Sequence, residues 1–280
     1  MSHNNPKISI ILPTYNRAQY LIKAVDSCLA QTFRDFELII IDDFSSDGTL
    51  SVAKNYAKMD KRIKVLSNSI NKKLPASLNI AFAEAKGKYL TWTSDDNLFH
   101  EKALETMNHY LDNMPDIGLV YTDYSLIDAN GKVTKRIYQE PPIFLPIRDC
   151  VGACFLYRAE VARQLGRYNE QMFLVEDYDY WLRLGLITKL FHIPESLYFY
   201  RTHTNSLTAT RKGEIRQAKK MLKDLYLPKY VIPTEHKPIL DLYMWFIEDR
   251  NYMSYFKLLK IIALHPITTL SYITKNLRRL

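Results

Sequence analysis

Glycine and cysteine are scarce in this chain of 280 residues, and the shortage of glycine excludes two classes of nucleotide-binding protein. The chain has 8 glycines, and no two of them are separated by a single residue, so the Gly-rich loop of dinucleotide-binding enzymes is missing. Gly87-Lys88 and Gly131-Lys132 lack the glycine five residues earlier that a P-loop requires. Rossmann dehydrogenases and P-loop enzymes are therefore disfavoured.

The 3 cysteines, Cys28, Cys150 and Cys154, form no Cys-x-x-Cys pair, which argues against a disulfide framework and against a Cys-rich zinc site. We expect them to be packing residues in a reducing compartment. Long apolar runs are also absent, because no stretch reaches the roughly 18 apolar residues that a membrane span needs. We therefore expect a cytoplasmic protein without an export signal.

Acidic residues are scarce near the C-terminus. Residues 206–280 contain 14 Lys and Arg against 6 Asp and Glu, which accounts for the whole net charge of +8, and no acid follows Asp249. On a helical wheel, Leu270, Ile273 and Leu277 lie opposite Lys275 and Arg278. This pattern predicts peripheral contact with the inner face of a membrane; packing on the catalytic domain or on a second subunit is the alternative. No nucleic-acid motif is present, and the oligomeric state is open.

Hydrophobic periodicity predicts an α/β fold. Strands are expected at residues 8–12, 38–41, 63–66 and 89–93, alternating with helices that begin near residue 21 and cover 49–59, 75–85 and 101–113. A hairpin of residues 119–127 and 132–138 is expected around Asn130-Gly131. Further predictions are a loop at 141–150, a helix at 177–186, and helices from Gly213 onward that are broken at Pro228, Pro233, Pro238 and Pro266. The fold class is a mixed, mainly parallel sheet flanked by helices, with a catalytic domain at 1–205 and a basic helical extension at 206–280.

Polar clusters follow three of the predicted strands. They are Thr14 to Arg17, Asp42 with Asp43, and Ser94 to Asn97. Each cluster alone is compatible with a helix cap or an Asx turn. Because ligands bind outside the carboxyl ends of the strands in such sheets, three clusters at one edge favour a binding site. Asp95 and Asp96 suit a hard, oxygen-preferring cation such as Mg or Mn.

Four motifs carry a family resemblance. They are Ser9-Ile-Ile-Leu-Pro-Thr-Tyr-Asn-Arg17, Glu37-Leu-Ile-Ile-Ile-Asp-Asp43, Ser94-Asp-Asp-Asn97 and Glu176-Asp-Tyr-Asp-Tyr-Trp181. In their order and spacing they resemble a family 2 glycosyltransferase of GT-A (Rossmann-like) fold, over about residues 7–205. The resemblance implies an inverting enzyme that moves a sugar from a nucleoside diphosphate donor, expected to be a UDP-sugar, to an acceptor hydroxyl. It also suggests a role in making cell-surface polysaccharides or lipid-linked saccharides, so the acceptor would be a saccharide or lipid-linked.

The resemblance also implies roles for individual residues. Asp177 would be the catalytic base, with Glu176 and Asp179 as alternatives. Asp96 and His203 would hold the divalent cation. The residues implied to bind the nucleotide sugar are Pro13, Thr14, Tyr15, Arg17, Asp43, Asn79, Asp95 and Arg201, of which Tyr15 would stack on the base and Arg201, in a loop, would neutralise phosphate charge.

The sequence departs from the family pattern at two positions. Thr93 stands where the first acid of an Asp-x-Asp-Asp stretch is usual, and Leu78 stands where many relatives carry an arginine. Lys72 or Lys73 could compensate for that arginine. These departures keep open a catalytically inactive GT-A-like binding or scaffold module. A nucleotidyltransferase is a weaker alternative, because the loop after Pro13 lacks glycines.

Overall fold

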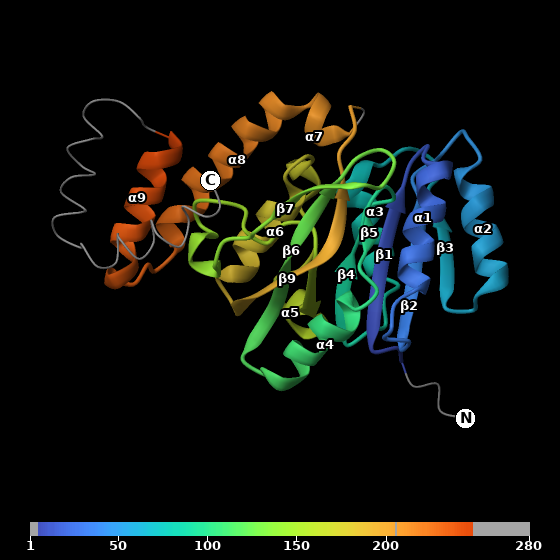
Figure 1. Ribbon diagram of the computed structural model, residues 1–280, viewed down its shortest axis with the longest axis horizontal. Helices are drawn as coiled ribbons and strands as arrows, with labels where there is room; N and C mark the ends of the chain where they lie inside the picture. Colours follow the sequence, from blue (N-terminus) through green and yellow to red (C-terminus); the bar gives the residue numbers. More distant parts are fainter. Residues whose placement is uncertain (1–4, 205, 249–280) are drawn as a thin grey trace.

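The structure is a computed structural model that describes residues 5–204 and 206–248. Its amino-terminal half forms one parallel sheet with the strand order β3-β2-β1-β4 (Figure 1). The strands are β1 (Ile8–Thr14), β2 (Phe36–Asp42), β3 (Ile63–Ser67) and β4 (Tyr89–Trp92). Each contains β-branched or aromatic residues, and β1, β2 and β4 are largely buried, whereas in β3 only Ile63 is buried. The four strands lie where the sequence predicted them, so this part of the fold is confirmed.

The helices of this half connect the parallel strands. They are α1 (Ala18–Leu29), α2 (Thr49–Met59), α3 (Lys73–Phe82) and α4 (Ala103–Asn113). Their predicted positions are confirmed, except that α3 begins earlier and ends at Phe82 rather than near residue 85. Pro75 is tolerated in α3 because it lies in the first turn, where backbone N–H groups have no partner within the helix.

The remaining strands make the sheet mixed. They are β5 (Leu98–Phe99), β6 (Ile117–Ile127), β7 (Val133–Ile137), β8 (Phe155–Arg158) and β9 (Lys189–Arg201). Strand β8 pairs antiparallel with both β4 and β6, whereas β9 runs parallel to β6. The predicted β6–β7 hairpin is confirmed, with Gly131 at a φ of +91° in its turn. Over the described residues this gives a nine-stranded sheet and the predicted α/β, GT-A-like class.

The carboxyl-terminal half supplies five more helices within the described residues. They are α5 (Ala159–Leu165), α6 (Glu176–Gly185), α7 (Leu207–Thr210), α8 (Lys212–Tyr226) and α9 (Lys237–Glu248). Short 3-10 turns lie at Pro142–Phe144 (η1), Glu170–Met172 (η2), Leu227–Lys229 (η3) and Thr234–His236 (η4). Pro238 was expected to break a helix, but it lies in the first turn of α9, where proline is accepted. Pro266 and the wheel at 270–280 lie outside the described residues.

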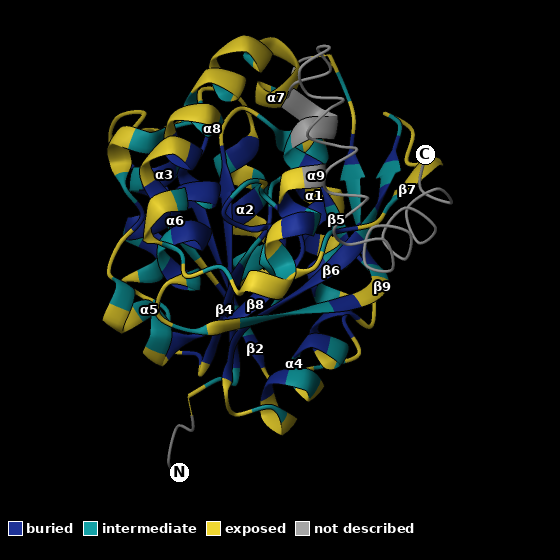
Figure 2. Ribbon diagram, turned by 90° about the vertical axis from the view of Figure 1, so that its left-hand side faces the viewer, coloured by how far each residue is buried: buried dark blue, intermediate teal, exposed yellow. Residues whose placement is uncertain are grey.

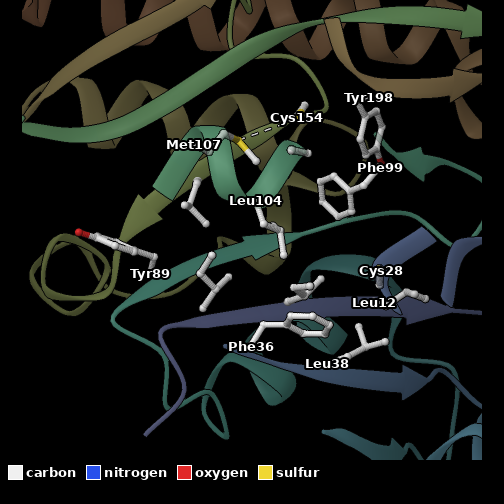
Figure 3. Close-up of a cluster of buried hydrophobic side chains, with 14 of the residues drawn as sticks. Leu12, Cys28, Phe36, Leu38, Tyr89, Phe99, Leu104, Met107, Cys154 and Tyr198 are labelled. Atoms are coloured by element: carbon white, nitrogen blue, oxygen red, sulfur yellow. Dashed lines mark hydrogen bonds between the residues drawn. The ribbon is translucent and has the colours of Figure 1, made fainter. Parts of the chain in front are cut away.

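Buried residues, dark blue in Figure 2, are concentrated in the sheet and on the helix faces that pack against it, and apolar side chains pack on both faces of the sheet. One cluster joins β1 and β2 to α1 and α4, and Figure 3 shows Leu12, Cys28 and Leu104 within it. The second cluster joins the opposite face of the same strands to α3, α6 and α8. The three cysteines are free and buried, and burial raises the pKa of each thiol to about 12, so they act as packing residues. None of the helices in the described part of the chain is long and apolar enough to cross a membrane.

Candidate active site

A cavity of about 710 Å³ lies at the carboxyl ends of β1, β2 and β4. Residues from three of the predicted motifs line it, as do Asp177 and residues of α8. Parallel strands whose carboxyl ends meet at one edge explain why segments far apart in the chain converge here. The predicted residues that line the cavity are Pro13, Thr14, Tyr15, Arg17, Asp43, Asp95, Asp96 and Asp177.

The loop after β1 is fixed to the loop after β4. The Thr14 hydroxyl donates to Asp95 Oδ2 at 2.8 Å, and the backbone N–H of Tyr15 donates to the same oxygen at 3.3 Å. Asn16 has a φ of +52°, a left-handed conformation that asparagine tolerates, and its side-chain oxygen accepts from the backbone N–H of Ser46 at 2.8 Å. The Tyr15 side chain is 47% exposed, which leaves its ring accessible at the cavity wall.

Asp43 organises the wall beside this loop. Its carboxylate accepts from Asn68 Nδ2 at 2.8 Å and from the backbone N–H groups of Lys72 and Lys73 at 2.7 and 2.8 Å. A carboxylate can accept about four hydrogen bonds, so Asp43 retains capacity for one donor from a ligand. The neighbouring Asp42 is buried and accepts from the backbone of Ser45 at 3.1 Å.

Asp95 and Asp96 stand side by side after β4 and differ in their partners. Burial, followed by the charge of Asp96, raises the pKa of Asp95 to about 7, although Thr14 and Arg17 oppose the rise. Asp96 Oδ2 lies 2.9 Å from His203 Nε2, and the His203 ring stacks on Tyr20. The two residues predicted to hold the cation are therefore neighbours, although His203 does not itself line the cavity.

The structure offers a partial ligand set for a divalent cation. Across residues 5–204 and 206–248, no three His, Cys, Asp or Glu side chains are grouped closely enough to hold a metal ion. Mg²⁺ and similar cations are, however, often bound by one or two carboxylates together with substrate phosphates. Asp96 with its neighbour Asp95 fits that kind of site, in which the donor would supply the remaining ligands.

Thr93, the first departure from the family pattern, lies beneath the cavity floor. Its side chain is buried, and its hydroxyl lies 2.6 Å from the hydroxyl of Tyr198, which lines the cavity. A carboxylate at this position would be buried against a phenol in place of the neutral hydroxyl pair. Leu78, the second departure, is fully buried in the core, whereas Lys73, one of the two lysines considered as a replacement for that arginine, lines the cavity.

Asp177 occupies the first turn of α6, where backbone N–H groups favour a carboxylate. Its Oδ1 accepts from the backbone N–H of Tyr178 at 2.7 Å. Burial, followed by the charge of Asp149, raises its pKa, while Lys219 counteracts the rise. Burial and the charge of Asp177 also raise the pKa of Glu176, whose buried Oε2 has no hydrogen-bond partner among the described residues.

Asp179, the third acid of this motif, is buried, and both of its carboxylate oxygens have partners within the protein. It pairs with Arg183 at 2.9 Å, and its other oxygen accepts from the Tyr226 hydroxyl at 3.0 Å. It does not line the cavity. The structure therefore favours Asp177 over Asp179 as the carboxylate that faces a ligand.

Two residues that the sequence predicted to bind the donor, Asn79 and Arg201, do not line the cavity. Asn79 lies outside the cavity, because its amide bonds to both backbone groups of Tyr168 and to Glu170. Arg201 is buried and belongs to β9 rather than to a loop, and its guanidinium donates to the carbonyl oxygens of Asp96, Asp128 and Ala129. These bonds leave Asn79 and Arg201 as structural residues.

The cavity also contains side chains that sequence reasoning missed. Tyr124 on β6, Asp149 before β8 and Lys219 on α8 line it near Asp177. None of them belongs to a recognisable motif. The only sequence signal was the basic character of residues 206–280, which did not single out Lys219.

The fold is GT-A-like, and comparison with known proteins establishes the family. A family model described as "Glycosyl transferase family 2" matches residues 9–166. The chain therefore belongs to glycosyl transferase family 2, and its class of activity is glycosyl transfer. Among curated relatives, the "Putative glycosyltransferase EpsE" of Bacillus subtilis is 34% identical over 187 residues, which cover 65% of this chain and 67% of EpsE.

Two solved structures share the fold. TarS of S. aureus in complex with UDP-GlcNAc matches with a TM-score of 0.68 at 16% identity, covering 88% of this chain and 74% of that chain. The mannosyltransferase PcManGT of Pyrobaculum calidifontis, in complex with GDP-Man and Mn²⁺, matches with a TM-score of 0.67 at 16% identity, covering 99% and 82%. At these identities the likeness is one of fold.

Proposed function

We propose that the protein is an inverting glycosyltransferase that transfers a sugar from a nucleoside diphosphate donor, with UDP as the preferred nucleotide, to an acceptor hydroxyl. The observation that carries the proposal is the convergence of Tyr15, Asp43, Asp96 and Asp177 on one cavity. The complexes of the two structural relatives, with UDP-GlcNAc and with GDP-Man, support a nucleotide sugar as the ligand.

The nucleotide would occupy the end of the cavity nearest β1 and β2. Tyr15 offers an exposed ring for the base, and Asp43 can accept one further hydrogen bond from the base or ribose. Arg17 and Lys73 line the same region and would attract the diphosphate. The sugar would then point along the cavity toward α6.

Inversion needs one carboxylate that takes the proton of the acceptor hydroxyl as its oxygen attacks the anomeric carbon. Asp177 is suited to this role because it lines the cavity and its pKa is raised toward neutrality. The pKa of Glu176 is also raised, which favours its neutral form, so Glu176 is suited to donating a hydrogen bond instead.

A divalent cation, Mn²⁺ or Mg²⁺, would be held by Asp96, with Asp95 beside it. His203 would exchange its hydrogen bond to Asp96 for a place as a further ligand. When bound, the cation would neutralise the charge that develops on the leaving diphosphate. PcManGT was solved with Mn²⁺, which supports the assignment.

The acceptor is proposed to be a saccharide, free or lipid-linked, presented at a membrane surface on the cytoplasmic side for a cell-surface polymer. Two features of α8 support membrane contact: exposed Met221 and Leu225 lie on the same helix as exposed Lys220 and Arg216. Residues 206–280 would be the extension that makes this contact.

The test is release of nucleoside diphosphate from a panel of UDP-, dTDP- and GDP-sugars, with and without Mn²⁺. The proposal predicts metal-stimulated release from at least one donor, and loss of that release in Asp177→Asn. A binding or scaffold module would release nothing from any donor, in wild type as in the variant.

A further inference from the structure

An ion pair outside the family motifs lies in the same cavity as Asp177. Lys219 Nζ on α8 and Asp149 Oδ2, in the segment between η1 and β8, are 2.9 Å apart, and both residues line the cavity. The Lys219 side chain remains 40% exposed, whereas that of Asp149 is 11% exposed. The carboxylate of the pair is therefore largely buried, and the lysine side chain is only partly so.

Helix α8 is fixed to α6, the helix that carries Asp177. The Tyr226 hydroxyl at the end of α8 donates to Asp179 Oδ1 at 3.0 Å, and the Tyr230 hydroxyl donates to the carbonyl oxygen of Leu182 at 2.7 Å. Leu222 of α8 is fully buried in the same cluster as Trp181 of α6. These contacts hold α8, which carries Lys219, against α6, which carries Asp177.

The charges that face Asp177 come from several elements. Glu176 precedes it on α6, Asp149 approaches from the segment before β8, Lys219 approaches from α8, and the hydroxyls of Tyr168 and Tyr200 also lie within electrostatic range. Asp149 disfavours a negative charge on Asp177, and Lys219 favours one.

Lys219 itself stays protonated. Burial alone would lower its pKa, but Asp149 and Asp177 more than compensate, and the pKa is raised. Its ammonium group also lies over the ring of Tyr178, 5.6 Å from the centroid, so a second contact holds the cation near the start of α6.

We propose that Lys219, anchored by Asp149, is a positioning residue of the transfer reaction, which supplies a positive charge to the part of the cavity that Asp177 lines. This inference rests on the proposed role of Asp177 as the base. It assigns α8, which the sequence marked only as part of a basic extension, to the catalytic unit.

The two members of the pair have opposite effects on Asp177, which makes the proposal testable. Lys219→Met removes the favourable charge and leaves Asp149 unopposed, so the pKa of Asp177 should rise by about one pH unit or more, the usual effect of a nearby charge. Asp149→Asn removes the unfavourable charge and should lower it. A structural disturbance alone would not produce shifts of opposite sign.

The measurement is a carbon-detected NMR titration of protein labelled at its aspartate carboxyl carbons, with the Asp177 signal assigned by its loss in Asp177→Asn. Lys220→Met, at the exposed neighbouring position on α8, is the matched control and should leave the titration unchanged. No substrate is present, so the result is independent of whether the proposed function is correct. An Asp177 pKa that is equal in wild type, Lys219→Met and Asp149→Asn would overturn the proposal.

Thermal unfolding and a charge-conserving variant distinguish a loss of charge from a loss of folding. Thermal unfolding is followed for each variant, because Lys219→Met leaves the largely buried Asp149 carboxylate without its cation and should lower the melting temperature. Lys219→Arg keeps the charge and should restore the wild-type titration. If Lys219→Arg shifted Asp177 as far as Lys219→Met does, charge would not be the cause and the proposal would fail.

Discussion

Asp177 is the side chain to which we assign the role of general base. Like Glu176, it lines the cavity, whereas Asp179 does not and is paired with Arg183. We expect Asp177→Asn to reduce the rate of transfer by about 10²–10⁴-fold, the usual contribution of a general base. Donor affinity, measured by calorimetry, should stay within a few-fold of wild type; transfer at the wild-type rate would mean that another group is the base.

The pH dependence of transfer follows from the raised pKa of Asp177. A carboxylate can take a proton only when it is ionised, so the rate should rise with pH through a pKa above the ordinary value near 4. Stopped-time assays of nucleoside diphosphate release, at saturating donor, should therefore show an acid limb that lies well above pH 4. A rate that is flat or falls across this range would contradict the role given to Asp177.

Asp96 should control metal-dependent donor binding. Asp96→Ala removes the carboxylate proposed to hold the cation, so the enhancement of UDP affinity by Mn²⁺ should disappear in isothermal titration calorimetry. Asp116→Ala, at an exposed position before β6, is the control and should bind like wild type. If the enhancement survived in Asp96→Ala, the cation would be bound elsewhere.

Helix α6 supports the site through Trp181. This side chain is fully buried, with its ring centroid 4.5 Å from that of Phe155 and 5.8 Å from that of Tyr157. Trp181→Ala should lower the free energy of unfolding by about 3–5 kcal/mol, the cost of emptying a large core position. Urea denaturation is the measurement, and Ile187→Ala, at a partly exposed position just after α6, should cost far less. A loss below about 1 kcal/mol in Trp181→Ala would show that α6 is not anchored in this way.

Local sequence patterns predicted the parallel half of the sheet but missed β8 and β9. Strand β8 is short, and β9 contains Pro194 and Glu195, which argue against a strand. Pro194 is accommodated because the register of β6 and β9 shifts between Thr122 and Asp123, so the ladder is irregular there. Residues 189–201 therefore form a strand because they pair with β6. A short stretch of sequence cannot predict this, because β6 lies far away in the chain.

In the candidate site too, some residues could be predicted from local sequence and others could not. Residues directly after β1, β2 and β4 converge because strand ends must meet at one edge, so Thr14, Asp43 and Asp96 were predictable. Arg201 has a suitable charge for binding phosphate, but three backbone carbonyls accept its hydrogen bonds. Lys219 enters the cavity only because α8 packs on α6, a tertiary contact without a sequence motif.

At the scale of the whole molecule, the excess of positive charge lies in residues 206–280. We therefore predict that the protein binds anionic membranes. Vesicles with anionic lipid should sediment the protein, and added salt should release it because surface charges are screened. Replacing Lys275, Arg278 and Arg279 by Gln should weaken binding, since each such charge near an anionic surface contributes about 1 kcal/mol. If wild type and the triple variant sedimented equally with the vesicles, these charges would not cause membrane binding and the prediction would be wrong.

The most direct test of the central claim is a crystal structure of the protein with UDP and Mn²⁺. The account predicts the uracil ring against Tyr15, the ribose or base within hydrogen-bonding distance of Asp43, the metal on Asp96 and the diphosphate directed toward Asp177. A nucleotide bound outside this cavity, or bound within it with the diphosphate pointing away from Asp96 and Asp177, would contradict it.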